Sequence, residues 1–264
     1  MAVIRDPRTM QIILLSTYAV LGLSLLQFSV TVVQIAVTLV LCVVLEILFV
    51  YAKQGKFIWP ASALITGLGI SLALRAEALF PFMVAAVAAI ALKHLVRYKG
   101  KHIFNPSNSG IVAVALLVPI AATDPLQWGN YLWVLALMSI GGFWLVYRVH
   151  KLPLVITFLG AFVGIHALRL FLWPEIWNTH FSSFMWGGLF IFTFNMITDP
   201  ATSPKSMKSQ VVFGALIALL AQVLIHLNVH HAVFISLAVV CAGWFLMRWL
   251  STQFQQNKSS SFAK

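Results

Sequence analysis

Long apolar runs dominate this sequence and restrict it to one class of fold. The first run continues from Ile12 almost without interruption to Val50, and similar runs recur along the rest of the chain. A helix needs about 20 apolar residues to cross the hydrocarbon of a bilayer. Hydrophobic residues make up 61% of the sequence and charged residues only 9%, which is typical of a polytopic membrane protein. The sequence therefore predicts an all-α integral membrane fold.

These runs divide into about ten transmembrane helices within a single membrane domain, residues 1–250. The first run is too long for the core of a signal peptide, so it is predicted to form two spans with a turn near residues 27–29. The other spans are predicted at residues 60–76, 79–97, 108–123, 130–147, 152–172, 181–198, 210–227 and 231–249. The polar residues 251–264 are predicted to be a disordered cytoplasmic tail.

The basic residues predict the orientation in the membrane. If the N-terminus is cytoplasmic, all 17 lysine and arginine residues except Arg75 and Arg169 fall on the cytoplasmic side. Cytoplasmic loops of membrane proteins carry such an excess, so both termini are predicted to be cytoplasmic. The net charge of +11 is distributed over short loops, and no nucleic-acid partner is predicted.

Metal and nucleophile chemistry is not indicated. Cys42 and Cys241 lie inside apolar runs without a C-x-x-C partner, so neither a disulfide nor a zinc or iron–sulfur site is predicted. The histidines at 226, 230 and 231 are interpreted as interfacial residues and not as metal or haem ligands. The chain has no P-loop, dinucleotide-binding turn or nucleophilic triad, so no catalytic residues are predicted.

Two polar stretches, residues 104–110 and 196–209, interrupt the apolar pattern. In each, Asn105 or Asp199 stands directly before a proline. This order predicts a helix start, with Asn105 or Asp199 as N-cap and proline at the first helical position. A helix N-terminus also attracts anionic groups, so plain capping and ligand contact are both open interpretations.

Short internal matches suggest a duplication. A proline is followed seven residues later by a glycine in both WPASALITGL and LPLVITFLGA, and the offset between these segments nearly equals that between Asn105 and Asp199. Repeat halves of about 11–124 and 130–250 would explain this, as in transporters built from repeats. Four intervening spans would make the repeat parallel, and a re-entrant segment would make it inverted. A chance match is the alternative.

Several motifs resemble a known family by their order and spacing over about residues 40–205. They are Glu46 near the end of span two, Ser62-Ala63-Leu64-Ile65-Thr66-Gly67-Leu68, Phe104-Asn105-Pro106 and Thr198-Asp199-Pro200-Ala201-Thr202-Ser203. They are similar to motifs of the family that unites the D subunit of Rnf electron-transport complexes with the B subunit of sodium-pumping NADH:quinone reductases.

The resemblance implies a flavin-binding subunit of a multi-pass complex in the bacterial inner membrane. Such subunits help to couple electron transfer to sodium or proton translocation, and their partners are other membrane and cytoplasmic subunits and the lipid bilayer. Respiratory members carry FMN on the threonine of a Ser-Gly-Ala-Thr sequence, which this chain lacks. FMN or riboflavin is therefore expected to bind non-covalently.

The predicted site residues follow from these motifs. Those expected to contact flavin are Thr66, Gly67, Asn105, Pro106, Ser107, Asp199 and Thr202. Glu46 and Asp199 are the predicted ion-pathway residues, because a carboxylate inside a membrane is costly. The alternative for Glu46 is a carboxylate at the end of a helix that is paired with Lys53 or Lys56 or reaches the membrane interface. Asp199 has the alternative role of a simple cap, and Gly67 that of helix packing.

Three classes of function are consistent with these observations. The first is a redox subunit that positions a flavin without being an enzyme by itself. The second is a transporter of flavin or another small molecule by alternating access. The third is a non-catalytic scaffold whose basic loops hold soluble redox or biosynthetic partners. Bound flavin, dependence on partners and solute flux distinguish the three.

Overall fold

The computed structural model describes residues 6–118, 128, 131–172 and 186–261. Its helices are α1 (Pro7–Ser24), α2 (Val32–Gln54), α3 (Ala61–Ala73), α4 (Phe80–Leu95), α5 (Pro106–Leu117), α6 (Leu132–Arg148), α7 (Leu152–Leu172), α9 (Trp186–Ile191) with the continuing π-helix η4 (Phe192–Met196), α10 (Met207–His226) and α11 (Ala232–Ser261). One small hairpin, of strands β1 (Arg97–Tyr98) and β2 (Lys101–His102), joins α4 to α5.

The predicted all-α membrane fold is confirmed. Helices α2, α7 and α10, and residues 232–255 of α11, are long and apolar enough to cross a membrane, and α3, α4, α5 and α6 are apolar but shorter. Parts of the spans predicted at 108–123 and 181–198 lie outside the described residues. The structure corrects the expected length of the span at 60–76, because α3 has 13 residues; α5 has 12 residues and ends next to the part of its span that is not described.

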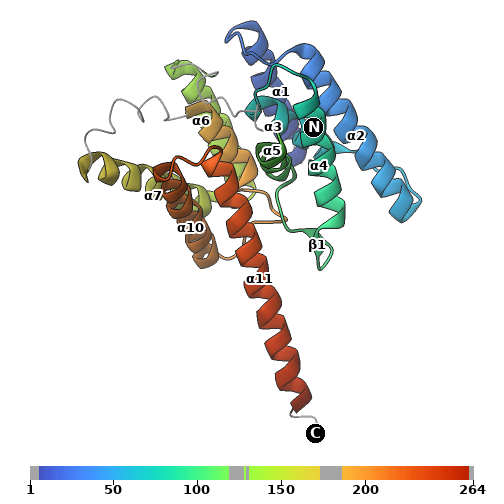
Figure 1. The fold of residues 1–264 in the computed structure, drawn as a ribbon, viewed down its shortest axis with the longest axis vertical. Coiled ribbons are helices and arrows are strands. Elements are labelled where there is room, and N and C mark those ends of the chain that lie inside the picture. Colours follow the sequence, from blue (N-terminus) through green and yellow to red (C-terminus); the bar gives the residue numbers. More distant parts are fainter. Residues whose placement is uncertain (1–5, 119–127, 129–130, 173–185, 262–264) are drawn as a thin grey trace.

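Helix α3 lies inside the bundle, packed against α1, α2, α4 and α5 (Figure 1). Nine residues of α3 are buried, whereas α2 exposes large apolar side chains such as Val33, Val40 and Leu48. An exposed apolar surface of this kind suits lipid and not water. The fold therefore separates lipid-facing helix surfaces from an interior that contains α3.

Close backbone approach joins neighbouring helices in each half of the chain. Helix α4 packs against α5, and α7 packs against α10. A Cβ at Gly110 of α5 would lie 2.5 Å from the Ala85 carbonyl oxygen, and one at Gly214 of α10 would lie 2.8 Å from the Leu154 carbonyl oxygen. Because glycine has no side chain, the backbones of these helices can approach each other closely.

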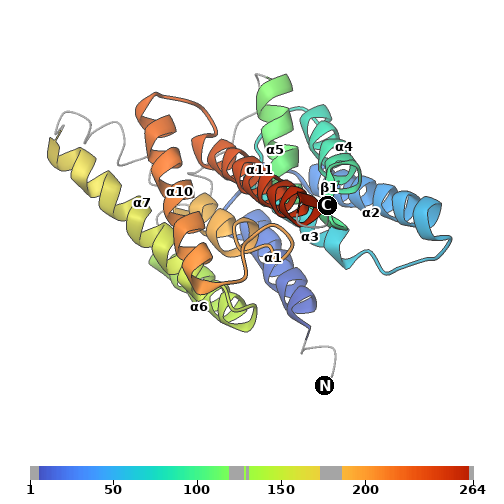
Figure 2. The ribbon, with the colours of Figure 1, turned by 90° about the horizontal axis from the view of Figure 1, so that it is seen from below.

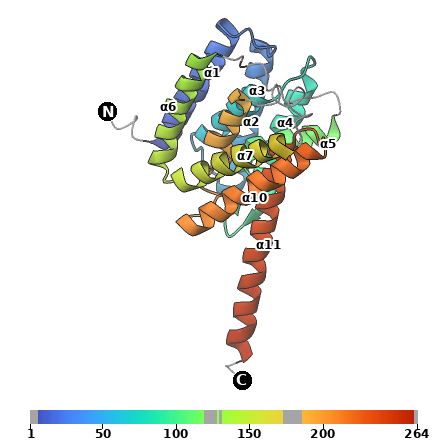
Figure 3. The ribbon, with the colours of Figure 1, turned by 90° about the vertical axis from the view of Figure 1, so that its left-hand side faces the viewer.

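Helix α11 lies between the two groups and extends beyond them. Seen along α11, the pair α7 and α10 lies on one side and the pair α4 and α5 on the other (Figure 2). Figure 3 shows α11 projecting from the body of the molecule. The helix reaches Ser261, so the tail predicted as disordered is helical over 251–261. No proline or glycine interrupts these residues, and the helix continues past the apolar part of the sequence.

Hydrogen bonds gather several basic loops at one end of the bundle. Lys53, after the apolar part of α2, donates to the His94 carbonyl at 2.8 Å, and Tyr98 of the hairpin donates to Thr252 of α11 at 3.3 Å. At the other end, Gln34 at the start of α2 donates to the Ala76 carbonyl at 3.0 Å. The two ends therefore match the two sides that the charge pattern predicts; Arg5 and Lys264 lie outside the described residues.

Candidate functional site

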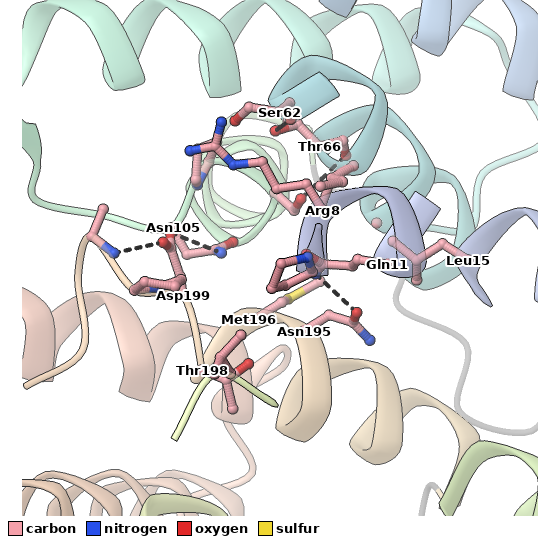
Figure 4. Close-up of a pocket in the computed structure, with 18 of the residues that line it drawn as sticks. Arg8, Gln11, Leu15, Ser62, Thr66, Asn105, Asn195, Met196, Thr198 and Asp199 are labelled. Carbon is pink, nitrogen blue, oxygen red and sulfur yellow. Dashed lines mark hydrogen bonds between the residues drawn. The ribbon is translucent and has the colours of Figure 1, made fainter. Parts of the chain in front are cut away.

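A polar cavity of about 190 Å³ opens where the short helices meet the N-terminal part of α1. Its wall includes Arg8 and Gln11 of α1, Ser62 and Thr66 of α3, and Asn105 at the start of α5. Residues of α6, η4 and the loop after η4 complete it (Figure 4). The cavity lies at the end of the bundle where the basic loops gather, because α3 and α5 both begin there.

Asn105 performs the capping role that the sequence predicts. Its Oδ1 accepts from the Asn108 backbone N–H at 3.0 Å, and Pro106 occupies the first turn. Because the oxygen is used for capping, the amide nitrogen of Asn105 is left to donate to Asp199 Oδ2 at 3.3 Å. Figure 4 shows the two side chains meeting at the cavity wall. The two interrupting stretches of the sequence are thus brought into contact.

Asp199 is not a helix N-cap, and this corrects the sequence prediction. Its Oδ1 accepts from the Ala201 N–H at 2.9 Å, within a turn that does not continue as a helix. Pro204 has no N–H and disfavours a helical conformation at Ser203. Helix α10 starts later, with Ser206 as its N-cap. The Asp199 carboxylate is therefore held by a loop.

Lys151 holds that loop from the turn between α6 and α7. Its Nζ donates to the Pro204 carbonyl at 2.6 Å, and the lysine is only 4% exposed. Burial lowers the pKa of this amine from 10.5 to about 8, and the negative charge of Asp199 acts in the opposite direction. The charge pattern of the sequence indicates only a loop lysine at this position, because its burial depends on packing that no local motif reveals.

Two amide side chains on the opposite wall are functional candidates that the sequence motifs do not predict. Gln11 Nε2 of α1 donates to Asn195 Oδ1 of η4 at 3.0 Å, and both line the cavity (Figure 4). Asn195 lies in the π-helical turn, a local irregularity that is frequent at functional sites. An asparagine within the apolar run 189–197 was the available sequence signal. Arg8, which also lines the cavity, was assigned only to membrane orientation.

Of the two predicted site residues of α3, Thr66 faces the cavity and Gly67 does not. Thr66 lines the cavity, and its carbonyl accepts from Ser107 Oγ at 3.1 Å. A Cβ at Gly67 would lie 3.2 Å from the Leu39 Cα of α2, so this glycine serves helix packing. Pro106 and Ser107 line the cavity as well. Most of the predicted contact residues therefore lie together, and Gly67 points away.

Glu46 lies outside the cavity and is fully paired. Lys93 Nζ of α4 donates to Glu46 Oε1 at 2.6 Å, and His94 Nε2 lies 2.9 Å from Glu46 Oε2. The predicted alternatives, Lys53 and Lys56, are not its partners. Lys93 Nζ also donates to Ser62 Oγ at 3.0 Å, and Ser62 lines the cavity. The Glu46–Lys93 ion pair is thus connected to the cavity wall through Ser62.

Thr202 lies in a second, smaller pocket of about 120 Å³. This pocket is bounded by the β1–β2 hairpin, the loop after Asp199 and one face of α11, and it shares His102 and Ala201 with the polar cavity. His102 Nδ1 donates to the Phe104 carbonyl at 2.8 Å and lies 3.8 Å from Asp199 Oδ2. His102 therefore stands between the two hollows.

The polar cavity suits recognition of a polar ring better than bond-making chemistry. The amides of Asn105, Asn195 and Gln11 provide hydrogen-bond donors and acceptors, and Asp199 provides an acceptor and a charge. Its enclosed volume of about 190 Å³ is below the roughly 300 to 1,000 Å³ of pockets for drug-sized ligands. Within the described ranges, no group of three or more His, Cys, Asp or Glu is placed to hold a metal ion.

These features define an integral membrane protein with a polar site enclosed by short and irregular helices near one membrane face. Residues 128–246 match the model of the NQR2, RnfD, RnfE family, which confirms the family assigned from the sequence. The matched region indicates a membrane subunit of the Rnf/Nqr type of electron-transport complex. The match includes the Asp199 motif, and Asn105 lies before it. No curated protein matches the chain.

Proposed function

We propose that this protein is a non-covalent flavin-binding subunit that passes electrons within its membrane complex, and that the polar cavity is the flavin site. The observation that carries the proposal is the convergence of Asn105 and Asp199, from two distant segments, on the wall of one cavity. A bound flavin supplies the redox chemistry, and the protein supplies its position and electrostatic environment.

The donor set fits the edge of a flavin ring. The polar side of that ring presents carbonyl oxygens and ring nitrogens, which match the amides of Gln11, Asn105 and Asn195. Arg8 provides a positive charge at the same cavity, and a positive charge stabilises a reduced, anionic flavin. The cavity lies at the membrane face predicted to be cytoplasmic, which suits exchange of electrons with cytoplasmic subunits of a complex in a bacterial inner membrane.

Coupling to ion movement belongs to the same proposal. Asp199 is the carboxylate exposed to the cavity, and Glu46 is joined to the cavity wall through Lys93 and Ser62. Because Glu46 already has two positively polarised partners, it is a poorer cation ligand than Asp199. The ion path proposed here therefore begins at Asp199.

The first experiment is the visible absorbance spectrum of the purified protein, followed by acid precipitation and chromatography of any released flavin. Flavin in the supernatant at near-stoichiometric yield supports the proposal. Flavin that stays with the pellet contradicts the non-covalent attachment. A colourless protein that takes up no added flavin favours a transporter, if it moves a solute when reconstituted alone, or otherwise a scaffold.

Two variants of Asn105 separate recognition from capping. Asn105→Leu removes both the cap and the amide, and Asn105→Ser keeps a good N-cap but removes the amide. We expect both variants to lose most of the bound flavin, and only Asn105→Leu to lose about 1 kcal/mol of stability. Asp199→Leu should lower flavin occupancy as well. Wild-type occupancy in Asn105→Ser would show that Asn105 is only a cap.

A further inference from the structure

The second pocket has a basic rim that the polar cavity does not use. Lys99 and Lys101 reach it from the hairpin, and Arg248 reaches it from α11. Of the ion pairs among the described residues, those near this end join Glu46 to Lys93 and His94, and Asp199 to His102. None of the three rim cations is paired with an acidic residue there. The pocket is therefore a concentration of positive charge without an internal counterion.

The geometry of the hairpin fixes two of these cations. Lys99 and Gly100 both have positive φ, of 48° and 80°, which is the backbone of a tight type I′ hairpin turn. Tyr98 OH donates to Thr252 Oγ1 at 3.3 Å, and its ring packs edge-on against Phe245 at 5.2 Å. The hairpin is thereby anchored to α11, and the basic residues at its tip are held at the pocket.

One face of α11 forms the floor. Cys241, Trp244, Phe245 and Arg248 line the pocket at helical spacing. The Trp244 ring packs edge-on against Phe213 of α10 at 5.4 Å, so its position is fixed from behind. Lys99, Lys101 and Arg248 are themselves exposed, and the fixed aromatic floor beneath them distinguishes this hollow from a basic loop alone.

The local electrostatics agree with this description. The hydrogen bond with Thr252 lowers the pKa of the Tyr98 phenol, burial opposes this effect, and the positive charges of Lys99 and Arg248 lower the pKa further. The Lys99 ammonium also lies 5.3 Å from the centre of the Tyr98 ring, within the range of a cation–π contact. The field at the rim therefore favours negative charge.

We propose that Lys99, Lys101 and Arg248 bind a phosphoryl group in this second pocket. Two sources supply that chemistry at this position. One is the phosphate of a flavin nucleotide whose ring occupies the adjoining cavity, since the two hollows share His102 and Ala201; this source rests on the proposed function. The other is the headgroup of an anionic phospholipid, since Leu246, Met247 and Trp249 beside the pocket are exposed. Charged hydrogen bonds from lysine and arginine suit either one.

The test compares a pocket variant with a charge-matched control in the full-length protein. The pocket variant is Lys101→Gln with Arg248→Gln, and the control is Lys205→Gln with Lys208→Gln, two exposed lysines outside the pocket. For the flavin source, equilibrium binding of FMN is compared with that of riboflavin, which lacks the phosphate. For the lipid source, native mass spectrometry compares retention of phosphatidylglycerol with that of phosphatidylcholine.

If the flavin phosphate is the ligand, wild type and control bind FMN at least about tenfold more tightly than riboflavin, and the pocket variant loses that preference, because charged hydrogen bonds to the phosphate are gone. Its riboflavin affinity stays unchanged. If a lipid headgroup is the ligand, the pocket variant alone loses phosphatidylglycerol. Equal FMN affinity and equal phosphatidylglycerol retention in both variants overturns the inference. Failure of wild type to bind riboflavin or FMN contradicts the proposed function separately.

Discussion

At the scale of single residues, Lys93 has the clearest energetic role. It compensates the Glu46 carboxylate within the bundle, where both side chains are about 10% exposed. Removing one member of a buried ion pair leaves an uncompensated charge. Lys93→Met should therefore destabilise the protein by about 3 to 5 kcal/mol, measured by thermal unfolding in detergent.

A double variant separates charge compensation from packing. Glu46→Gln combined with Lys93→Met removes both charges and should recover a large part of the lost stability. Lys56→Met, at an exposed loop position, is the control and should unfold like the wild type. If Lys93→Met were as stable as Lys56→Met, then His94 alone would be sufficient to stabilise Glu46.

Lys151 predicts a pH dependence of stability. The pKa of its buried amine is about 8 in the folded protein, against 10.5 as the ordinary value. Between these values the unfolded chain holds a proton that the folded chain has released, so the free energy of unfolding increases as the pH rises. Thermal unfolding should therefore shift to higher temperature from pH 7.5 to 9.5.

Lys151→Met provides the comparison for this prediction. The variant loses the hydrogen bond to the Pro204 carbonyl and should be less stable than the wild type at pH 9.5, where the wild-type amine is uncharged. Its unfolding temperature should also change less between pH 7.5 and 9.5 than that of the wild type. An identical pH slope in both proteins would assign the effect to another group.

At the scale of elements, glycines set the distance between paired helices. Gly110→Ala would place a methyl group against the Ala85 backbone of α4, and neither helix can yield by a side-chain rotation. We expect the free energy of unfolding, measured in detergent, to fall by about 1 to 3 kcal/mol.

Gly160→Ala in α7 is the matched control, because no atom lies within 4 Å of the added carbon. It should be neutral or slightly stabilising, since alanine favours a helix. Equal stability of the two variants would contradict close packing of α4 and α5.

At the scale of the whole molecule, the two ends of the bundle should face opposite sides of the membrane. The test uses two single-cysteine variants. His230→Cys places the cysteine in the loop before α11, and Lys56→Cys places it in the loop after α2. In a chain with Cys42 and Cys241 replaced by alanine, a membrane-impermeant maleimide added to intact cells should label only residue 230. Labelling of residue 56 before cell lysis would reverse the predicted orientation.

Much of the fold was predictable because it depends on local properties of the chain. The turn near residues 27–29 and the starts of most spans agree with the structure within a few residues. Run length and polarity determine where a helix can cross lipid. The same information does not distinguish a complete span from a short interior helix such as α3 or α5, since this depends on neighbours that cover the ends of the helix.

The sequence by itself determined the apolar helices, the Asn105 cap and the basic loops, because each depends on residues close together in the chain. Only the tertiary structure decided that Asn105 meets Asp199, that Gln11 meets Asn195, and that Glu46 is paired with Lys93. These contacts join distant segments through helix packing. The physical reason is that a polar side chain in a membrane protein needs a partner, and the three-dimensional packing of the helices selects which partner is within reach.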